Sequence, residues 1–321
     1  MGANDNRRMS HISSMSAPTS GIVPLTHWGV IRARGADAAT FLHSQLTNDF
    51  ANLGLDEARL AGYCSAKGRL LASFVAWKTA PDEVLLACHA SVLAATSKRL
   101  SMFVLRAQCK LGDASAEVRL FGLAGTAAQD ALGTAPVWHR QAVDGGSLMR
   151  LPDGAGVSRA LLATTAAPPA LPALSLDTWR WLEVQSGIAV IEASTAEHFV
   201  PQMLNFELVG GVNFQKGCYP GQEIVARSQY RGTVKRRTFL FDVDAAAAPG
   251  QEVFHSADPG QPAGLVANAA PRVDGAGSSA LVEIKLAALE GGEIRLASAD
   301  GPVLAQRELP YAVLSDAGQP A

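Results

Sequence analysis

No long hydrophobic run is present in this sequence. The strongest candidate, residues 84–95, spans 12 residues and contains His89, whereas a membrane-spanning helix needs about 20. The first 20 residues hold Arg7 and Arg8 but no apolar stretch, so a secretory signal is not expected. We therefore expect a cytoplasmic protein with no membrane contact, in which residues 1–20 form a disordered tail.

Cysteine is scarce, and neither cysteine nor histidine is clustered. The four cysteines form no C-x-x-C pair, which argues against a zinc site or a disulfide framework and fits a reducing compartment. The seven histidines are scattered without a metal-binding pattern. The sequence also lacks Walker A, G-x-S-x-G and H-E-x-x-H motifs. We therefore expect no metal at the functional site.

Charge of one sign is not in excess, and charged residues are few. Lys and Arg total 27 against 29 Asp and Glu, a net charge of −2, so a generally basic nucleic-acid-binding surface is excluded while a local patch is not. Hydrophobic residues make up 48% of the chain, which is enough to form a core and excludes wholesale disorder. The length of 321 residues predicts about two domains, or three small ones.

Short strand-like and helix-like segments are mixed along residues 21–232. We expect strands at 27–33, 59–65, 69–77, 83–88, 117–122, 147–151 and 158–163, and helices at 38–46, 91–104, 126–132 and 176–186. The regular βαβ rhythm of a doubly wound sheet is missing, so the predicted fold class is α+β with antiparallel pairing. Ser175 is expected to cap the last of these helices. Three prolines in residues 166–172 predict a loop or linker, and the short strands after residue 232 predict a small all-β barrel or sandwich.

The most unusual segment runs from Gly210 to Arg227 and holds four glycines and a proline. Cys218 precedes a helix expected from Gln222 and lies two residues from Lys216. A helix N-terminus and a nearby lysine both favour the thiolate form of a cysteine. Two interpretations of Cys218 stay open from residue types alone: a reactive or ligand-holding cysteine, and a small buried residue in a loop.

Residues Lys216–Arg227 read K-G-C-Y-P-G-Q-E-I-V-A-R. This stretch resembles the signature of the YgfZ family, folate-binding proteins that are related to the glycine-cleavage T-protein, an aminomethyltransferase. Three further segments resemble other parts of that family: Gly35–Asp49, Cys64–Ser73 and Phe199–Asn205. The resemblance therefore covers nearly the whole chain.

The resemblance implies both a fold and a function. The fold would be a GcvT-like ring of three modules around a central folate-binding opening, with two interleaved modules in residues 21–232 and a C-terminal β-barrel in residues 233–321. The cofactor would be tetrahydrofolate or a one-carbon derivative of it. The implied role is the assembly or repair of iron–sulfur clusters in client enzymes, some of which modify tRNA, so the partners would be these clients or cluster-assembly proteins.

Two tryptophans match positions that contact folate in the family, Trp28 and Trp179. A flat indole offers a large stacking surface to a pterin or aminobenzoyl ring, although residue types alone would favour two core tryptophans. Gln185 stands where the T-protein has its pterin-binding glutamate. A glutamine has one acceptor oxygen where a carboxylate has two, so folate binding is expected to be weaker here or differently oriented.

Four charged residues and Cys218 complete the site that the resemblance implies. Cys218 is the expected nucleophile or transient ligand, and Lys216 would hold it as thiolate or bind the folate glutamate tail. Lys67 matches a second family lysine and is otherwise a solvated turn residue. Glu223 and Arg227 would line the opening near Cys218, or form an ordinary i,i+4 ion pair.

One departure from the T-protein argues against aminomethyl transfer, which is the first alternative function. The T-protein carries an acid–base aspartate pair after the glycine of its second segment, whereas residues Gly68–Ser73 contain no carboxylate. The second alternative is a module that binds tRNA or a client without catalysis. It rests on a run of basic residues that also suits a solvated strand edge: Arg227, Arg231, Lys235, Arg236 and Arg237.

Overall fold

The computed structural model describes residues 19–230 and 234–313. Residues 1–18 of the expected tail, and Arg231 of the basic run, lie outside the described residues. Ser20, at the end of that expected tail, hydrogen-bonds through its hydroxyl to the Thr126 hydroxyl at 2.7 Å. None of the helices in the described ranges has the length and apolar character needed to cross a bilayer.

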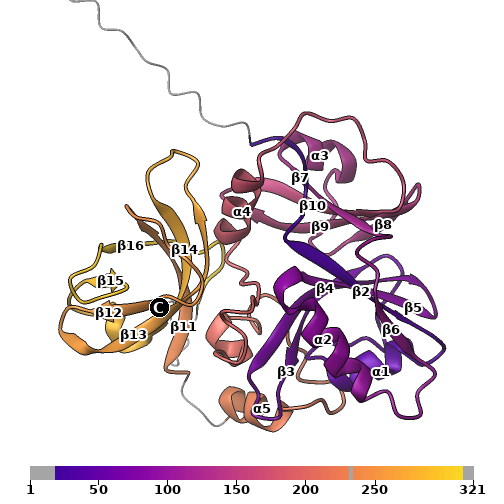
Figure 1. The fold of residues 1–321 in the computed structure, drawn as a ribbon, viewed down its shortest axis with the longest axis horizontal. Helices are drawn as coiled ribbons and strands as arrows, with labels where there is room; N and C mark the ends of the chain where they lie inside the picture. The colour runs from indigo at the N-terminus through magenta and orange to yellow at the C-terminus, as the bar shows by residue number, and fades with distance from the viewer. Residues whose placement is uncertain (1–18, 231–233, 314–321) are drawn as a thin grey trace, which may run out of the picture.

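Three sheets, all with antiparallel pairing, form the framework (Figure 1). The strand order of the first is β1 (Gly21–Pro24), β7 (Arg119–Ala124), β10 (Val157–Thr164), β9 (Gly146–Gly154) and β8 (Arg140–Val143). That of the second is β3 (Ala58–Cys64), β4 (Leu70–Ala80), β5 (Glu83–His89), β2 (Trp28–Arg34) and β6 (Lys110–Asp113). That of the third is β15 (Ile294–Leu296), β12 (Glu252–His255), β13 (Asp258–Pro271), β14 (Ser278–Lys285), β11 (Arg236–Val243) and β16 (Leu304–Arg307).

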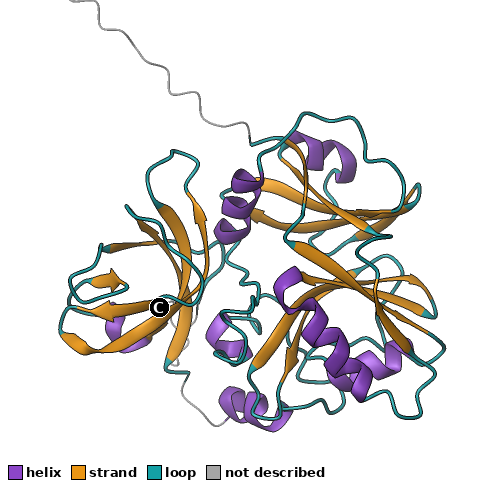
Figure 2. Cartoon of the chain, viewed as in Figure 1, coloured by secondary structure: helices purple, strands orange, loops and turns teal. Residues whose placement is uncertain are grey.

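Helices lie against these sheets and between them (Figure 2). The α-helices are α1 (Ala38–Gln45), α2 (Ala90–Met102), α3 (Thr126–Leu132), α4 (Leu176–Gln185) and α5 (Gln222–Tyr230), with 3-10 helices η1 (Pro201–Leu204) and η2 (Leu286–Leu289). Each helix expected from the sequence is found within two residues of its predicted ends. The mixture of helices with antiparallel sheets agrees with the predicted α+β class.

The first two sheets pack face to face over a shared core. Val30, Val75 and Trp77 of the second sheet meet Met149 and Leu161 of the first, and all five are buried. Helices α1 and α2 cover the other face of the second sheet, while α3 covers the other face of the first. The chain forms β1 in the first sheet, then the whole second sheet, and then returns to the first, so the two sheets are interleaved in sequence.

Helix α4 stands between the first sheet and the third (Figure 1). Its N-cap is Ser175, as predicted, because the Ser175 hydroxyl accepts a hydrogen bond from the Thr178 amide at 3.0 Å. On the side that faces the third sheet, Trp181 Nε1 and Gln185 Nε2 both donate to the Ser279 hydroxyl of β14, at 3.2 and 3.1 Å. That hydroxyl donates in turn to Asp242 of β11. Helix α4 is therefore tied by hydrogen bonds to the third sheet.

Candidate functional site

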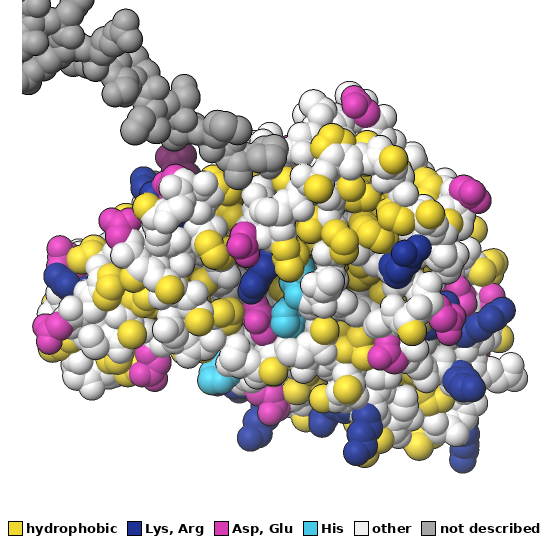
Figure 3. Space-filling view, turned by 45° about the horizontal axis from the view of Figure 1, so that its top comes forward, with side chains coloured by type: hydrophobic (Ala, Val, Ile, Leu, Met, Phe, Trp, Pro, Cys, Tyr) yellow, Lys and Arg dark blue, Asp and Glu magenta, His cyan; other side chains and the backbone are white. Residues whose placement is uncertain are grey.

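A cavity lies between the first two sheets and the inner face of α4. Its empty space is about 530 Å³, open solvent included, and three of its wall residues are the tryptophans Trp28, Trp138 and Trp179. A more polar pocket adjoins it, with an empty space of about 370 Å³, open solvent again included, and shares Trp28 and Glu183. Figure 3 shows histidine side chains beside acidic and basic ones in the hollow next to the third sheet. The site is therefore an aromatic cavity with a charged end.

The structure brings the two predicted tryptophans, Trp28 and Trp179, into the same cavity wall. Trp28 is half-buried at the start of β2. Trp179 is fully buried; its ring lies against Gly122 of β7, where a Cβ atom would come within 2.5 Å of it, and the Arg159 guanidinium lies 4.7 Å from the ring centre. Trp179 is thus a core residue that also forms part of the wall.

The structure does not place Gln185 in this cavity, which corrects the expectation for that residue. Gln185 faces β14 and is held there by Ser279. The carboxylate that lines both the cavity and the polar pocket is Glu183. Helical geometry explains this, because Glu183 lies four residues after Trp179 and shares its face, whereas Gln185 lies six residues after and about 240° around the helix.

Glu183 is held by charged neighbours from different elements. Its Oε2 atom lies 3.1 Å from His27 Nε2, while Oε1 is buried without a hydrogen-bond partner among the described residues. Burial alone would raise the pKa of Glu183, but His27 and the nearby Arg159 guanidinium together hold it below its usual value. The group is therefore a carboxylate at neutral pH, with one oxygen open to a hydrogen-bond donor.

A second histidine–glutamate pair lies beside the first in the polar pocket. The rings of His27 and His89 are 6.0 Å apart, and His89 Nε2 lies 3.9 Å from Glu192. The Ser91 amide donates to His89 Nδ1 at the start of α2, which places the ring hydrogen on Nε2. Burial lowers the pKa of His89, so this ring is neutral at physiological pH.

Sequence reasoning missed His27, His89, Glu183 and Glu192. The helical spacing of Trp179 and Glu183 was a usable signal. The other three could not be grouped from the sequence, because the β2–β5 pairing and the loop after α4 bring them together. Ser73, in the segment without a carboxylate that argues against aminomethyl transfer, lines the cavity and accepts a hydrogen bond from the Ile191 amide.

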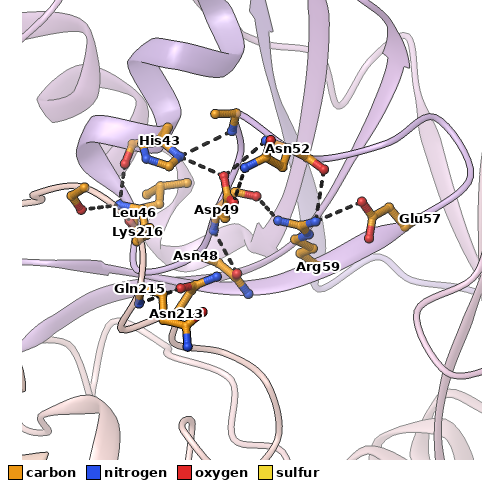
Figure 4. Close-up of polar contacts among 12 residues, drawn as sticks. His43, Leu46, Asn48, Asp49, Asn52, Glu57, Arg59, Asn213, Gln215 and Lys216 are labelled. Atoms are coloured by element: carbon orange, nitrogen blue, oxygen red, sulfur yellow. Dashed lines mark hydrogen bonds and ion pairs between the residues drawn. The ribbon is translucent and has the colours of Figure 1, made fainter.

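Lys216 and Cys218 lie apart from the aromatic cavity, in a loop beside the C-terminal end of α1. Lys216 Nζ donates to the backbone oxygens of His43, Leu46 and Gly217 (Figure 4). An ammonium has three hydrogens, and these three carbonyl groups can accept all of them. Lys216 therefore ties the loop to α1, and its expected contact with a folate tail is not supported by this geometry.

Cys218 is exposed, so the interpretation as a buried loop residue is wrong. Helix α5 begins at Gln222, as predicted, but three residues separate it from the cysteine. Lys67 is also exposed, in the turn before β4. That turn packs on the start of α5, since a Cβ on Gly68 would lie 2.8 Å from Ile224. Lys67 is therefore near α5 and not in the cavity.

Glu223 and Arg227 are exposed on α5 and line neither the cavity nor the polar pocket. Among the described residues, no ion pair joins them. Both the expected lining role and the expected i,i+4 pair are therefore absent from this geometry.

Two residues of the basic run form internal ion pairs, which corrects the interpretation of the run as an anion-binding patch or a solvated strand edge. Arg237 is buried, and its guanidinium contacts Glu207 at 2.5 Å. Arg236 pairs with Glu283 on the neighbouring strand. Only Arg227 and Lys235 of the described members are exposed. A tRNA contact through Arg236 and Arg237 would have to compete with these carboxylates.

Comparisons with known proteins relate this chain to two groups. A family model described as the GCVT N-terminal domain matches residues 15–144. A solved structure of the glycine cleavage system aminomethyltransferase T from Bartonella henselae superposes with a TM-score of 0.72, covering 92% of this chain and 87% of that chain at 16% identity. At this identity the similarity establishes a shared fold.

Several known proteins are more similar to this chain in sequence than that structure is. A tRNA-modifying protein YgfZ from Serratia proteamaculans is 30% identical over 241 residues, which are 71% of this chain and 72% of that protein. Proteins of the same name from Sodalis glossinidius and Colwellia psychrerythraea are also 30% identical, over 71% and 70% of this chain and 73% and 72% of their own lengths. This chain therefore belongs to the YgfZ family.

Proposed function

We propose that this protein binds a reduced folate in the cavity between Trp28 and Trp179. One observation carries the proposal: five buried polar atoms around the cavity and its polar pocket have no hydrogen-bond partner among the described residues. They are His27 Nδ1, Trp28 Nε1, Arg159 Nε, Trp179 Nε1 and Glu183 Oε1. Of these, the Trp179 indole lies close enough to the Glu183 carboxylate to help lower its pKa. Buried polar groups are nearly always paired in folded proteins, so this wall suits a ligand with both donors and acceptors.

A folate fits that set of atoms. The pyrimidine edge of a reduced pterin carries N–H donors for Glu183, and its carbonyl oxygen can accept from an indole or a guanidinium. The flat ring suits the aromatic wall of Trp28, Trp138 and Trp179. Arg180, at the polar end, would meet the anionic glutamate tail.

The proposed role of the folate-bound protein is in the assembly or repair of iron–sulfur clusters in client enzymes, including enzymes that modify tRNA. The name of the YgfZ relatives, tRNA-modifying protein, supports the link to tRNA modification. Exposed Cys218 would be the group that meets a client or a cluster-assembly protein, in the cytoplasm. A bound folate would supply one-carbon chemistry at the cavity, while Lys216 holds the cysteine loop.

The implied architecture is part of this proposal. The three sheets would form the three modules of the ring, with residues 21–232 as the folate-binding region. Residues 233–321 would form the barrel. A β-bridge between Arg295 and Val303, next to the edge strands β15 and β16, supports closure of the third sheet.

A folate titration tests the binding site. Tetrahydrofolate and its 5-formyl derivative are titrated into the wild type, and intrinsic tryptophan fluorescence is recorded. We expect saturable quenching, and about tenfold weaker binding or more in Glu183→Gln, because a buried charge-assisted hydrogen bond is lost. The matched variant Gln185→Glu, two residues away on the opposite side of α4, should bind as the wild type does. Absence of saturable binding would overturn the proposal, as would wild-type affinity in Glu183→Gln.

A further inference from the structure

The cysteine loop lies against a histidine that the proposed function does not use. His43 is in the last turn of α1, and its ring faces Gly217, the residue before Cys218. A Cβ atom on Gly217 would lie 3.6 Å from His43 Nε2. Cys218 is the next residue along the loop, with its Cα atom about 3.8 Å from that of Gly217, and no hydrogen bond joins its thiol to His43 among the described residues.

The orientation of the His43 ring is fixed from its other side. Asp49 Oδ1 lies 3.0 Å from His43 Nδ1, and the Ala51 amide approaches the same nitrogen at 3.3 Å (Figure 4). The two contacts need opposite tautomers, because the Ala51 amide requires a lone pair on Nδ1 and the Asp49 carboxylate requires a hydrogen there. The contact with the carboxylate is shorter and charge-assisted, and it favours the tautomer with the hydrogen on Nδ1. Among the described residues, Nε2 makes no hydrogen bond, so its lone pair faces the loop.

Asp49 is itself held in place. Its carboxylate accepts from the Asn52 amide at 3.1 Å and from the Asn52 side chain at 2.7 Å. Burial works to raise the pKa of Asp49, but the Asn52 hydrogen bonds and the charges of His43 and Arg59 hold it below its usual value. The group is therefore ionised at neutral pH and can stabilise a positive charge on the imidazole.

We propose that His43, oriented by Asp49, accepts the proton of the Cys218 thiol. The S–H bond breaks, the sulfur keeps the electron pair, and the proton forms a new bond to Nε2. Asp49 balances the imidazolium that results, and it acts as a positioning residue, without contact to the sulfur. The inference deepens the proposed function, because it rests on Cys218 as the reactive thiol.

The other charged groups at this place act in the same direction or are already paired. The Lys216 ammonium, on the loop itself, favours a thiolate nearby, and its hydrogens go to the α1 carbonyls and to Gly217. Arg59 of β3 donates to the Asp49 carbonyl and pairs with Glu57 at 2.9 Å. Arg59 cannot replace His43 as a proton acceptor, because a protonated arginine has no free lone pair. Burial lowers the pKa of Lys216 to about 8, so at pH 7 most of this side chain is also protonated and has no free lone pair.

Alkylation kinetics test this inference without any client or cofactor. Iodoacetamide is added to the full chain at pH values from 5.5 to 10, and the Cys218 peptide is followed by mass spectrometry. In the reaction an S–C bond forms, the C–I bond breaks and iodide leaves. Cys218 is the only exposed cysteine of the four, and half-buried Cys109 in the same sample serves as an internal control.

In His43→Gln, which keeps a hydrogen bond to Asp49 but cannot titrate, we expect the Cys218 alkylation rate at pH 7 to fall about tenfold. The rate near pH 10, where hydroxide ionises a thiol directly, should equal that of the wild type. Asp49→Asn should show the same pattern with a smaller loss. His198→Gln, an exposed histidine elsewhere, should leave the profile unchanged.

Two outcomes would overturn the inference. An unchanged rate at pH 7 in His43→Gln would show that the ring takes no proton from the thiol. An equal loss at every pH would show that His43 only supports the loop. The folate titration, run on the same variants, reports separately on the proposed function, because His43 and Asp49 do not line the cavity.

Discussion

Burial and hydrogen bonding together determine the position and the pKa of Lys216. Its side chain is half-buried below α1, and its three donors point at backbone carbonyls. Burial lowers the pKa of Lys216 to about 8, although Asp49 and Cys218 act against that shift. A lysine in this position is a helix C-terminal cap, and its charge becomes pH-dependent in a range that is easily measured.

The pH dependence of stability should reveal this lysine. The unfolded chain keeps the Lys216 proton up to a pKa of 10.5 and the folded chain loses it at about 8, so the unfolded state binds more protons between these values. The free energy of unfolding therefore gains a contribution that rises with pH from about 8 to 10, by at most about 1.4 kcal/mol per pH unit. Urea unfolding at pH 7, 8, 9 and 10 measures it.

The matched variants for this experiment are Lys216→Met and Lys235→Met. The first should lose the rise with pH, so that its free energy of unfolding falls relative to the wild type as the pH increases. The second removes an exposed lysine and should give a pH profile parallel to the wild type. Parallel profiles for Lys216→Met and the wild type would contradict the lowered pKa.

For single residues, the sequence was a better guide to the identity of the side chains around the cavity than to the direction in which each side chain points. The structure brings the two predicted tryptophans, Trp28 and Trp179, together in one cavity wall, and their contact with folate stays a prediction. Gln185 was assigned to the folate site from a motif match without the helical face of Trp179, whereas the structure places Glu183 in the cavity wall. Which side chain faces a cavity follows from the helix phase, and α4 has Gln185 on the side of the third sheet.

Among the elements, the helices were predictable and several strands were not. Helices α1, α3 and α4 show clear apolar spacing, and Ser175 marks the start of the last. Strand β13 reads D-P-G-Q-P-A-G-L-V-A-N-A-A-P, without the alternation of apolar and polar residues that marks a strand. It is a strand because it pairs with β12 and β14, and its local pattern does not predict this. Strands β1, β6 and β8 are four-residue edge strands, which carry too short a pattern to detect.

The packing of the cysteine loop against the turn before β4 gives a prediction at the scale of elements. Gly221 and Gly210 both have φ of +78°, but a Cβ on Gly221 would lie 2.3 Å from Ser65 O, whereas one on Gly210 would meet nothing within 4 Å. Gly210→Ala should cost about 1 kcal/mol, from the left-handed backbone alone. Gly221→Ala should cost at least about 2 kcal/mol more, because the turn and α5 must separate.

Urea unfolding of the two glycine variants gives these values directly. Cys218 alkylation provides a second readout, since a displaced loop alters the surroundings of the thiol and Gly210→Ala leaves them unchanged. Equal costs for the two substitutions would mean that the contact between Gly221 and Ser65 does not hold the loop.

On the scale of the whole molecule, the basic run shows what a linear sequence cannot reveal. Its members look like one exposed patch because their acidic partners lie far away in sequence: Glu207 precedes Arg237 by 30 residues, and Glu283 follows Arg236 by 47. Arg237 also donates to Asn205 Oδ1 at 3.2 Å and to Gln202 O at 3.3 Å. This guanidinium therefore joins the η1 region to the third sheet, from the first residues of β11.

Breaking this buried pair should weaken the whole fold. Arg237→Met leaves the Glu207 carboxylate buried without its cation, at a cost of about 3–5 kcal/mol, while the double variant Arg237→Met with Glu207→Leu should recover most of that loss. The surface pair of Arg295 and Glu293 is the control, and Arg295→Met should cost under about 1 kcal/mol. Chemical unfolding of all four proteins and the wild type, with Glu207→Leu as the fourth, completes the double-mutant cycle.

Because the pair connects η1 to the third sheet, a loss of stability confined to an early transition of that sheet would support separate unfolding of residues 233–321. A single-step transition that Arg237→Met leaves within about 1 kcal/mol of the wild type would instead mean that the Arg237–Glu207 pair contributes little to the stability of the fold.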